Sequence, residues 1–232
     1  VAREKGLESL AAFIFENQSA ACSEKAAEYI SAEKDVPDVA AALAGARDII
    51  AETISDDAPA RQAMREYFEQ NAVMSSKILT GKEEEGAKYR DYFNWSESAK
   101  TAPSHRILAV RRGEAEGFLI MRVIPEEAPA IEKLKQMYVK GNGEAAAQVA
   151  LAVEDSYKRL LSPTTETYMR LELKKRADAE AIAVFASNLK ELLMASPLGE
   201  KNVLAIDPGF RTGCKVVCLN RQGALLYNDV IY

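Results

Sequence analysis

An aspartate at the end of an apolar stretch has the surroundings that best suit chemistry in this sequence. The apolar run 203–206 leads into Asp207, and the glycine-containing polar loop 208–213 carries the chain into a second apolar run. A carboxylate at a strand end can bind a divalent cation, and a neighbouring glycine lets a phosphodiester backbone approach closely. Backbone N–H groups of such a loop can also meet phosphate oxygens. The pattern predicts Asp207 as a candidate metal ligand beside a phosphate-binding loop.

Five basic side chains are candidates for contact with nucleic acid. Arg211 and Lys215 flank the loop described above, and Arg106, Arg111 and Arg112 lie in the more basic middle of the chain. If they contact phosphate, removing one of them should flatten the salt dependence of binding. The alternative for Arg211 and Lys215 is a solvated strand edge.

Basic and aromatic side chains interleave between residues 82 and 112. The cations suit phosphate contacts and the rings suit stacking on single-stranded bases. The spacing of Tyr89, Tyr92 and Phe93 is instead typical of a buried helical face and favours a structural role for the rings. His105, the only histidine, is interpreted as a hydrogen-bonded structural residue. The basic run 174–176 is interpreted as the solvated face of a long helix.

Three further groups near the C-terminal end are not expected to bind a metal. Cys214 and Cys218 would lie about 13 Å apart on a strand, too far to share one ion, and are interpreted as buried small hydrophobes. Asp229 falls on the last predicted strand, but nothing in the motif places it beside Asp207. Phosphodiester hydrolysis with two metal ions needs several convergent carboxylates. We therefore do not expect this chain to be an enzyme by itself.

The segments that must position these residues are mostly helical. The run Val36-Pro37-Asp38 is expected to open the helix that contains residues 42–50. A start signal at Ser55, followed by acidic residues and proline, opens another. The pair Ser162-Pro163 is expected to end one helix and to cap the next, which is the longest in the chain. Apolar residues recur at helical spacing in the segments 7–14, 42–50, 60–68, 146–160 and 169–193.

Two regions depart from this helical pattern. A helix over 104–112, opened by Ser104, is followed by a turn bracketed by Gly113 and Gly117 and by a strand over 118–124, whose partner the sequence does not identify. After Pro197 the pattern changes to three meandering strands, at 203–206, 214–219 and 224–232. The predicted fold is mainly α: a multi-helix scaffold with a small strand insert near 104–124, followed by the first three strands of an incomplete α/β domain.

Composition and charge limit the possible classes of protein. The chain has 232 residues, 48% of them hydrophobic and 28% charged, with a net charge of -5, so a wholly basic nucleic-acid binder is excluded. Charge is uneven, with a net of -7 over residues 1–60 and +2 over residues 61–125. No apolar run approaches the length of a membrane span. Three cysteines and the absence of a signal peptide favour a reducing, cytoplasmic location, and a start without methionine suggests a piece of a longer protein.

The strand, aspartate and glycine loop near the C-terminus resemble the entry to the RNase H-like fold as RuvC-type resolvases use it. Actin-like ATPases begin similarly, and a plain hairpin whose aspartate caps its own turn is a third interpretation of the loop. The wider sequence is more specific. The run VLAIDPGFRTGCKVVCLNRQGALLYNDVIY (203–232) closely resembles the start of the YqgF domain in the Tex family of bacterial transcription accessory proteins.

Other segments resemble Tex proteins in the same order, and the resemblance covers essentially the whole chain. These segments are AREKGLESLAAFIF (2–15), ALAGARDIIAETIS (42–55), KEEEGAKYRDYF (82–93), PSHRILAVRRGEAEGFL (103–119) and AEAIAVFASNLKELLMASPLG (179–199). The resemblance implies a Tex-type helical region over 1–196 and the first strands of an incomplete YqgF, RNase H-like domain over 197–232.

The resemblance also implies a function for the longer protein. Tex proteins bind RNA or DNA and act in transcription, with helix-hairpin-helix elements and an OB-fold barrel beyond the region seen here. We therefore expect nucleic acid as a partner, with RNA polymerase or other transcription components as further partners, and no membrane. No cofactor is expected in this chain, although Mg²⁺ would fit Asp207 in a complete YqgF domain. The alternatives are a metal-dependent RuvC-like nuclease, an actin-like ATPase and a protein-interaction scaffold.

Overall fold

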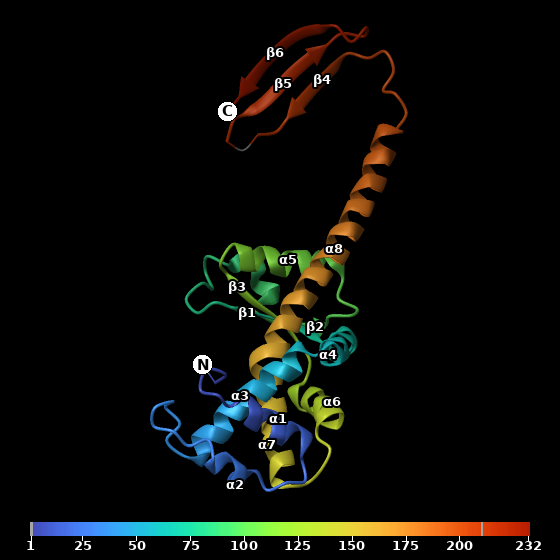
Figure 1. The fold of residues 1–232 in the computed structure, drawn as a ribbon. Coiled ribbons are helices and arrows are strands. Elements are labelled where there is room, and N and C mark those ends of the chain that lie inside the picture. Colours follow the sequence, from blue (N-terminus) through green and yellow to red (C-terminus); the bar gives the residue numbers. More distant parts are fainter. Residues whose placement is uncertain (1, 210) are drawn as a thin grey trace. The chain divides into compact units, whose positions relative to one another are not determined.

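The computed structural model describes residues 2–209 and 211–232. Phe210, which belongs to the predicted phosphate-binding loop, lies outside the described residues. The chain divides into two compact units, one ending at Ile182 and one spanning Ala183–Tyr232. The described helices and two three-stranded antiparallel sheets (Figure 1) confirm the expected mainly α fold with a strand insert and a strand-rich C-terminal part.

The predicted helices and strands occur in the expected order, and the structure adds elements that the sequence did not predict at residues 22–27, 73–78, 87–92, 94–98 and 127–138. The first part of the chain contains α1 (Glu8–Glu16), α2 (Cys22–Ala27), α3 (Val39–Asp56), α4 (Ala58–Asn71), β1 (Val73–Ile78), the 3₁₀ helix η1 (Ala87–Tyr92), β2 (Asn94–Ser98), α5 (Ser104–Ala115), β3 (Leu119–Ile124), α6 (Glu127–Tyr138) and α7 (Glu144–Asp155). The π-helical turn η2 (Ser156–Leu161), α8 (Ser162–Leu193), β4 (Val203–Asp207), β5 (Cys214–Leu219) and β6 (Leu225–Ile231) complete it.

Helix α3 lies at the centre of the helical core and contacts α1 and α7 (Figure 1). It begins where the sequence predicts, because the side chain of Asp38 accepts a hydrogen bond of 2.7 Å from the backbone N–H of Ala41 and so caps the helix. The predicted apolar faces of these helices are fully buried. They include Leu10, Ile14, Ala42, Ala46, Ile50, Ile54, Val149 and Val153.

The partner of the predicted strand near residue 120 is β1, which lies between β2 and β3 in the sheet order β2-β1-β3. One face of this sheet is buried: Met74 of β1 and Met121 and Val123 of β3 are fully enclosed. The helix α5 packs against β3 through Ile107 and Val110 (Figure 1). The sequence missed β1 and β2 because their short polar segments lack a strong apolar alternation.

The outer edge of β3 is covered by side chains instead of another strand. The carboxylate of Glu166 in α8 accepts a 2.9 Å hydrogen bond from the backbone N–H of Val123, and Arg170 donates to the carbonyl of Met121 at 2.8 Å. Glu114 of α5 accepts from the N–H of Met121 at 3.3 Å and also pairs with Arg170. The N–H groups of Met121 and Val123 and the carbonyl of Met121 point away from β1. The side chains of Glu114, Glu166 and Arg170 supply their hydrogen-bond partners, so this edge is not open to pairing with another strand.

The predicted turn around Gly113 is wrong. Gly113 is a buried residue of α5, which continues to Ala115, and the turn lies at Gly117, with φ of 77°. A methyl group on Gly113 would lie 2.6 Å from Cδ1 of Leu119, so any side chain there would force the buried Leu119 to shift. Ser104 is the first residue of α5 and not its cap; its hydroxyl donates to Glu180 of α8.

Two predicted helix boundaries are also corrected. Ser55 still belongs to α3, and α4 begins after Asp57. Ser162 has helical φ and ψ angles, and the chain passes from α7 through the π-turn η2 into α8 without a break. A π-turn shifts the hydrogen-bond pattern from i−4 to i−5, which allows the helix to pass Pro163, whose nitrogen has no hydrogen to donate.

The unit Ala183–Tyr232 contains a meander with the strand order β4-β5-β6. Both faces of this sheet carry exposed apolar side chains: Leu204 and Ile206 lie on one face, 64% and 55% exposed, and Val230 lies on the other, 37% exposed. The predicted apolar stripe of α8 is buried at Met169 and Leu173 but exposed from Ile182 onward. Cys214 and Cys218 are half-buried and not fully buried as predicted.

None of the helices in residues 2–209 and 211–232 combines the length and the apolar character that a membrane crossing requires.

Candidate nucleic-acid interface

Asp207 and Lys215 lie directly opposite each other on neighbouring strands. They form the last pair of the antiparallel register between β4 and β5, and opposite residues of such a pair project from the same face of a sheet. Asp207 is exposed, and so are Lys215 and Arg211. The structure thus gathers these three predicted residues at one end of one small sheet.

Asp229 lies on the opposite face of this sheet. It pairs in register with Val216, the neighbour of Lys215, and its strand β6 is separated from β4 by β5. Its carboxylate accepts a 2.7 Å hydrogen bond from the hydroxyl of Tyr227, and this bond lowers the pKa of Asp229 and raises the pKa of Tyr227. Asp229 therefore cannot complete a metal site with Asp207.

The described residues do not fit a divalent metal. They contain no group of three or more histidine, cysteine, aspartate or glutamate side chains that could hold an ion. The ammonium group of Lys215 opposite Asp207 also reduces the attraction of that face for a cation. Among the described residues, Asp207 is thus not part of a cluster of carboxylates, histidines or cysteines that could share a metal ion.

The three candidate arginines of α5 do not converge on one surface. A helix turns by about 100° per residue, so Arg106 and Arg111 point about 140° apart and Arg112 points in a third direction. Arg106 donates a 2.7 Å hydrogen bond to Glu97 of β2, which raises the pKa of Arg106. Arg111 donates to the backbone carbonyl of Arg170 at 3.3 Å. Arg112 is exposed.

The aromatic residues near α5 have the structural role that their spacing favours. Tyr89 is buried on η1, and its ring lies 6.0 Å from that of Phe118, centroid to centroid. Lys88 lies over both rings and pairs with Glu116 at 2.5 Å, which raises the pKa of Lys88 and lowers the pKa of Glu116. Tyr92, Phe93 and Trp95 are partly buried against the hydrophobic core, and the rings of Tyr92 and Trp95 meet edge to face with their centroids 5.7 Å apart.

The basic run 174–176 is only partly solvated. Lys174 and Lys175 form exposed pairs with neighbouring acidic residues of α8, as the sequence predicts. Arg176 is different, because its guanidinium donates to the backbone carbonyls of Ala99 and Ala102 at 3.1 and 3.0 Å, and to a third carbonyl at Lys100. The expectation of a solvated Arg176 is therefore wrong: the side chain clamps the turn that joins β2 to α5.

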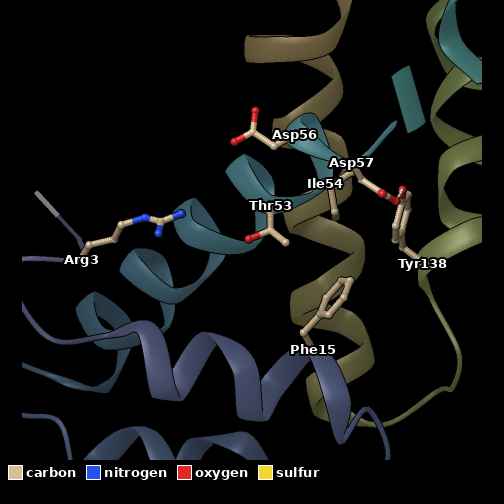
Figure 2. Close-up of a pocket in the computed structure, with 7 residues that line it drawn as sticks. All are labelled: Arg3, Phe15, Thr53, Ile54, Asp56, Asp57 and Tyr138. Carbon is tan, nitrogen blue, oxygen red and sulfur yellow. Dashed lines mark hydrogen bonds between the residues drawn. The ribbon is translucent and has the colours of Figure 1, made fainter. Parts of the chain in front are cut away.

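Figure 2 shows a pocket of about 550 Å³ lined by Arg3, Phe15, Thr53, Ile54, Asp56, Asp57 and Tyr138. Asp57 and Tyr138 point toward each other, and the Tyr138 hydroxyl donates a 2.5 Å hydrogen bond to Asp57. Asp56 pairs with Arg61 at 2.6 Å. Both carboxylates of the pocket therefore have partners within the protein.

The Tyr138 hydroxyl provides a pH-dependent contribution to stability. Burial and the hydrogen bond to Asp57 raise the pKa of Tyr138. The unfolded state loses this proton above about pH 10 while the native state keeps it, so stability falls as the pH rises through this range. We expect Tyr138→Phe to lower the free energy of unfolding by about 1 kcal/mol at pH 7. This deficit should shrink by about 1 kcal/mol between about pH 10 and 11.

Urea unfolding of the two proteins at several pH values measures this difference. A deficit that stays constant from pH 9 to 11 would show that Tyr138 does not titrate differently in the two states. Tyr29→Phe is a matched control, because the Tyr29 hydroxyl contacts Ser9 and no carboxylate.

Comparison with known proteins assigns the chain to a family. The model of the Tex central region matches residues 17–185, and the model of the YqgF-like domain of Tex proteins matches residues 201–232. The chain belongs to the Tex family. The first match falls almost entirely within the unit that ends at Ile182, and the second spans β4, β5 and β6. The sequence resemblance to Tex proteins is thereby confirmed.

Tex relatives match along the whole chain. It is 38% identical to Protein tex of Bordetella pertussis and 34% identical to Transcriptional accessory protein Tex of Neisseria gonorrhoeae, with 100% of this chain aligned in both cases. Human S1 RNA-binding domain-containing protein 1 is 26% identical over 81% of this chain and 20% of its own length. The chain spans 31% of the length of the two bacterial relatives. The predicted domain boundary between residues 196 and 197 stays a prediction.

Proposed function

We propose that this chain is part of a cytoplasmic, nucleic-acid-binding transcription accessory factor. In this proposal the helical unit is a scaffold that positions nucleic-acid-binding domains elsewhere in the protein. The observation that carries the proposal is the Tex family match along the entire chain, which includes a relative named as a transcriptional accessory protein. A relative named for an S1 RNA-binding domain supports nucleic acid as the ligand.

The contacts of the basic residues support a scaffold. Five arginines donate hydrogen bonds to carboxylates or backbone carbonyls within the protein: Arg106, Arg111, Arg122, Arg170 and Arg176. These side chains hold β3, α5 and the turn after β2 against α8, and Arg106 joins α5 to β2. The three that pair with carboxylates, Arg106, Arg122 and Arg170, also lose much of their attraction for phosphate, because each carboxylate offsets a positive charge. We propose that the scaffold by itself binds nucleic acid weakly, and that RNA polymerase or other transcription components bind the whole protein.

Binding measurements on the full-length protein and on this chain test the proposal. With fluorescent single-stranded RNA and DNA, we expect the full-length protein to bind both and to lose affinity steeply between about 50 and 200 mM salt. This chain should bind at least about tenfold more weakly, because it lacks most of the phosphate contacts. Full-length protein that ignores RNA and DNA at low salt would overturn the proposed function. Equal affinities would overturn the scaffold role.

A nuclease of the RuvC class is the second candidate function, and Asp207 is the observation that favours it. The other carboxylates would have to come from residues beyond Tyr232, and we propose that Mg²⁺ binds only when they are present. We expect millimolar Mg²⁺ to leave the melting temperature of this chain unchanged, and Asp207→Asn to behave identically. In the full-length protein, Asp207→Asn should weaken Mg²⁺ binding measured by calorimetry. An unchanged affinity there would exclude Asp207 as a ligand.

A further inference from the structure

A small pocket lies where the end of α3, the first turns of α4 and the start of α8 meet. Its volume is about 70 Å³, room for a group of a few heavy atoms. Two guanidinium groups and several hydroxyls surround it, and its lining consists of Ser55, Arg61, Arg65, Leu161, Thr164, Thr165 and Tyr168. Among the described residues no carboxylate lines this pocket, unlike the pocket of Figure 2 with its two aspartates.

Arg61 is held in position at one wall of this pocket. Its Nε donates to the backbone carbonyl of Ser55 at 2.6 Å, and its Nη2 donates to Asp56 at 2.6 Å. Arginine has five N–H donors, so these two bonds orient the side chain and leave donors for a ligand. Because the guanidinium is already fixed, an anion that binds here does not have to order it.

Arg65 lies one helical turn further along α4 and therefore on the same face as Arg61. Its guanidinium carbon is 4.8 Å from the centre of the Tyr168 ring, and both residues line the pocket. Within the described part of the chain, Arg65 contacts this ring and forms no ion pair with a carboxylate. Its N–H donors are thus available to a ligand.

The third wall comes from the start of α8, immediately after the π-turn η2. Such turns occur often at functional sites because they alter the direction of nearby side chains. Leu161 ends the π-turn and Thr164 follows it, with its hydroxyl bonded to the carbonyl of Leu160 at 2.7 Å. Thr165 is buried at the pocket and adds a hydroxyl that can donate to an anion.

The geometry points to a phosphate-binding pocket, and we assign its ligand as a backbone phosphate of single-stranded nucleic acid, an assignment that rests on the proposed function. Guanidinium groups and hydroxyls are the side chains that bind phosphate oxygens best. Arg61 and Arg65 together with Asp56 leave one net positive charge at the site. This charge matches the single negative charge of a phosphodiester better than the larger charge of free phosphate.

Two measurements on Arg61→Gln and Arg65→Gln test the inference, with Lys133→Gln as a control that removes one charge from an exposed position of α6 outside the pocket. In the first, inorganic phosphate is added to this chain at constant ionic strength and the melting temperature is recorded. In the second, the affinity of the full-length protein for a short single-stranded RNA is measured at several salt concentrations.

We expect phosphate to raise the melting temperature of the wild type and of Lys133→Gln, but not of either arginine variant. Each arginine variant should also weaken RNA binding by about tenfold. The slope of the logarithm of the binding constant against the logarithm of the salt concentration should fall in magnitude by about one. RNA affinities equal to that of the control would overturn the assignment while leaving the proposed function intact.

The remaining outcomes separate the two proposals. Full-length protein that binds no RNA would overturn the proposed function and with it the nucleic-acid ligand. If phosphate still raised the melting temperature of the wild type and of Lys133→Gln but not of the arginine variants, the pocket would be a site for free phosphate groups. A phosphate shift of the same size in the arginine variants would show that the pocket is not where phosphate binds.

Discussion

Replacing Glu166 by alanine is expected to lower the free energy of unfolding of this chain by about 3 kcal/mol. The Glu166 side chain is 11% exposed and makes three hydrogen bonds: two from Nε of Arg122, at 2.9 and 3.1 Å, and one from the N–H of Val123, at 2.9 Å. Alanine would leave the buried N–H of Val123 without a partner at the outer edge of β3. The loss is below that of a fully buried ion pair, because the Arg122 side chain is 55% exposed and can be hydrated.

Urea unfolding followed by the fluorescence of Trp95, the single tryptophan of the chain and a residue of β2, measures this loss in the same sheet. Glu172→Ala is the matched control, since Glu172 lies on the same helix and pairs with Lys175 at an exposed position. We expect the control to change stability by less than about 0.5 kcal/mol. Glu166→Gln keeps an oxygen for the N–H of Val123 and should lose only about 1 kcal/mol. Equal losses for Glu166→Ala and Glu172→Ala would refute the edge-covering role.

Glu166 also has a consequence for association between molecules. An edge strand with free N–H and C=O groups is a template for pairing with another chain. We therefore expect Glu166→Ala to form dimers or larger aggregates in light scattering at concentrations at which Glu172→Ala is unaffected. The carboxylate and guanidinium groups on the edge of β3 thus stabilise the fold and also prevent this edge from pairing with another molecule.

Arg176→Ala is expected to lower the free energy of unfolding by about 2 kcal/mol. The Arg176 guanidinium donates to the carbonyls of Ala99, Lys100 and Ala102, at distances between 2.9 and 3.1 Å. A charged group that donates to several carbonyls of one turn holds that turn in a single conformation. In the alanine variant, water can form hydrogen bonds with these carbonyls but cannot hold the turn in this conformation. The turn connects β2 to α5, so its loosening should weaken the packing of α5 on the sheet.

Lys175→Ala is the control for this substitution, because it removes the same charge from the neighbouring position, where the side chain pairs with Glu172 at the surface. We expect little change in that variant. Arg176→Lys should recover less than half of the loss, since an ammonium group cannot reach three carbonyls with the planar geometry of a guanidinium. Full recovery by lysine would show that charge alone, and not the geometry of the guanidinium, stabilises the turn.

The candidate interface was predictable only in part. Sequence spacing correctly places Lys215 near Asp207, because the loop between them is short and the two strands must run antiparallel. It groups Arg106, Arg111 and Arg112 by their proximity in the chain, whereas the helix directs them apart. It also passes over Arg61 and Arg65, whose separation of four residues places them on one helical face. That spacing signals a shared surface, but it does not indicate that Tyr168, about a hundred residues away, completes the pocket.

The sequence by itself determined the helical class, most of the helices but not α2 or α6, the strands of the C-terminal meander and the membership of the Tex family. These depend on local periodicity, on caps such as Asp38 and on motifs that short stretches of chain carry alone. Only the tertiary structure decided that β1 is the partner of β3, that Gly113 is buried in a helix, and that Arg176 clamps a turn. Glu166 and Val123 are 43 positions apart, and a contact between such residues forms only when helices pack. Such contacts leave no periodic trace in the sequence, which is the physical reason that they could not be foreseen.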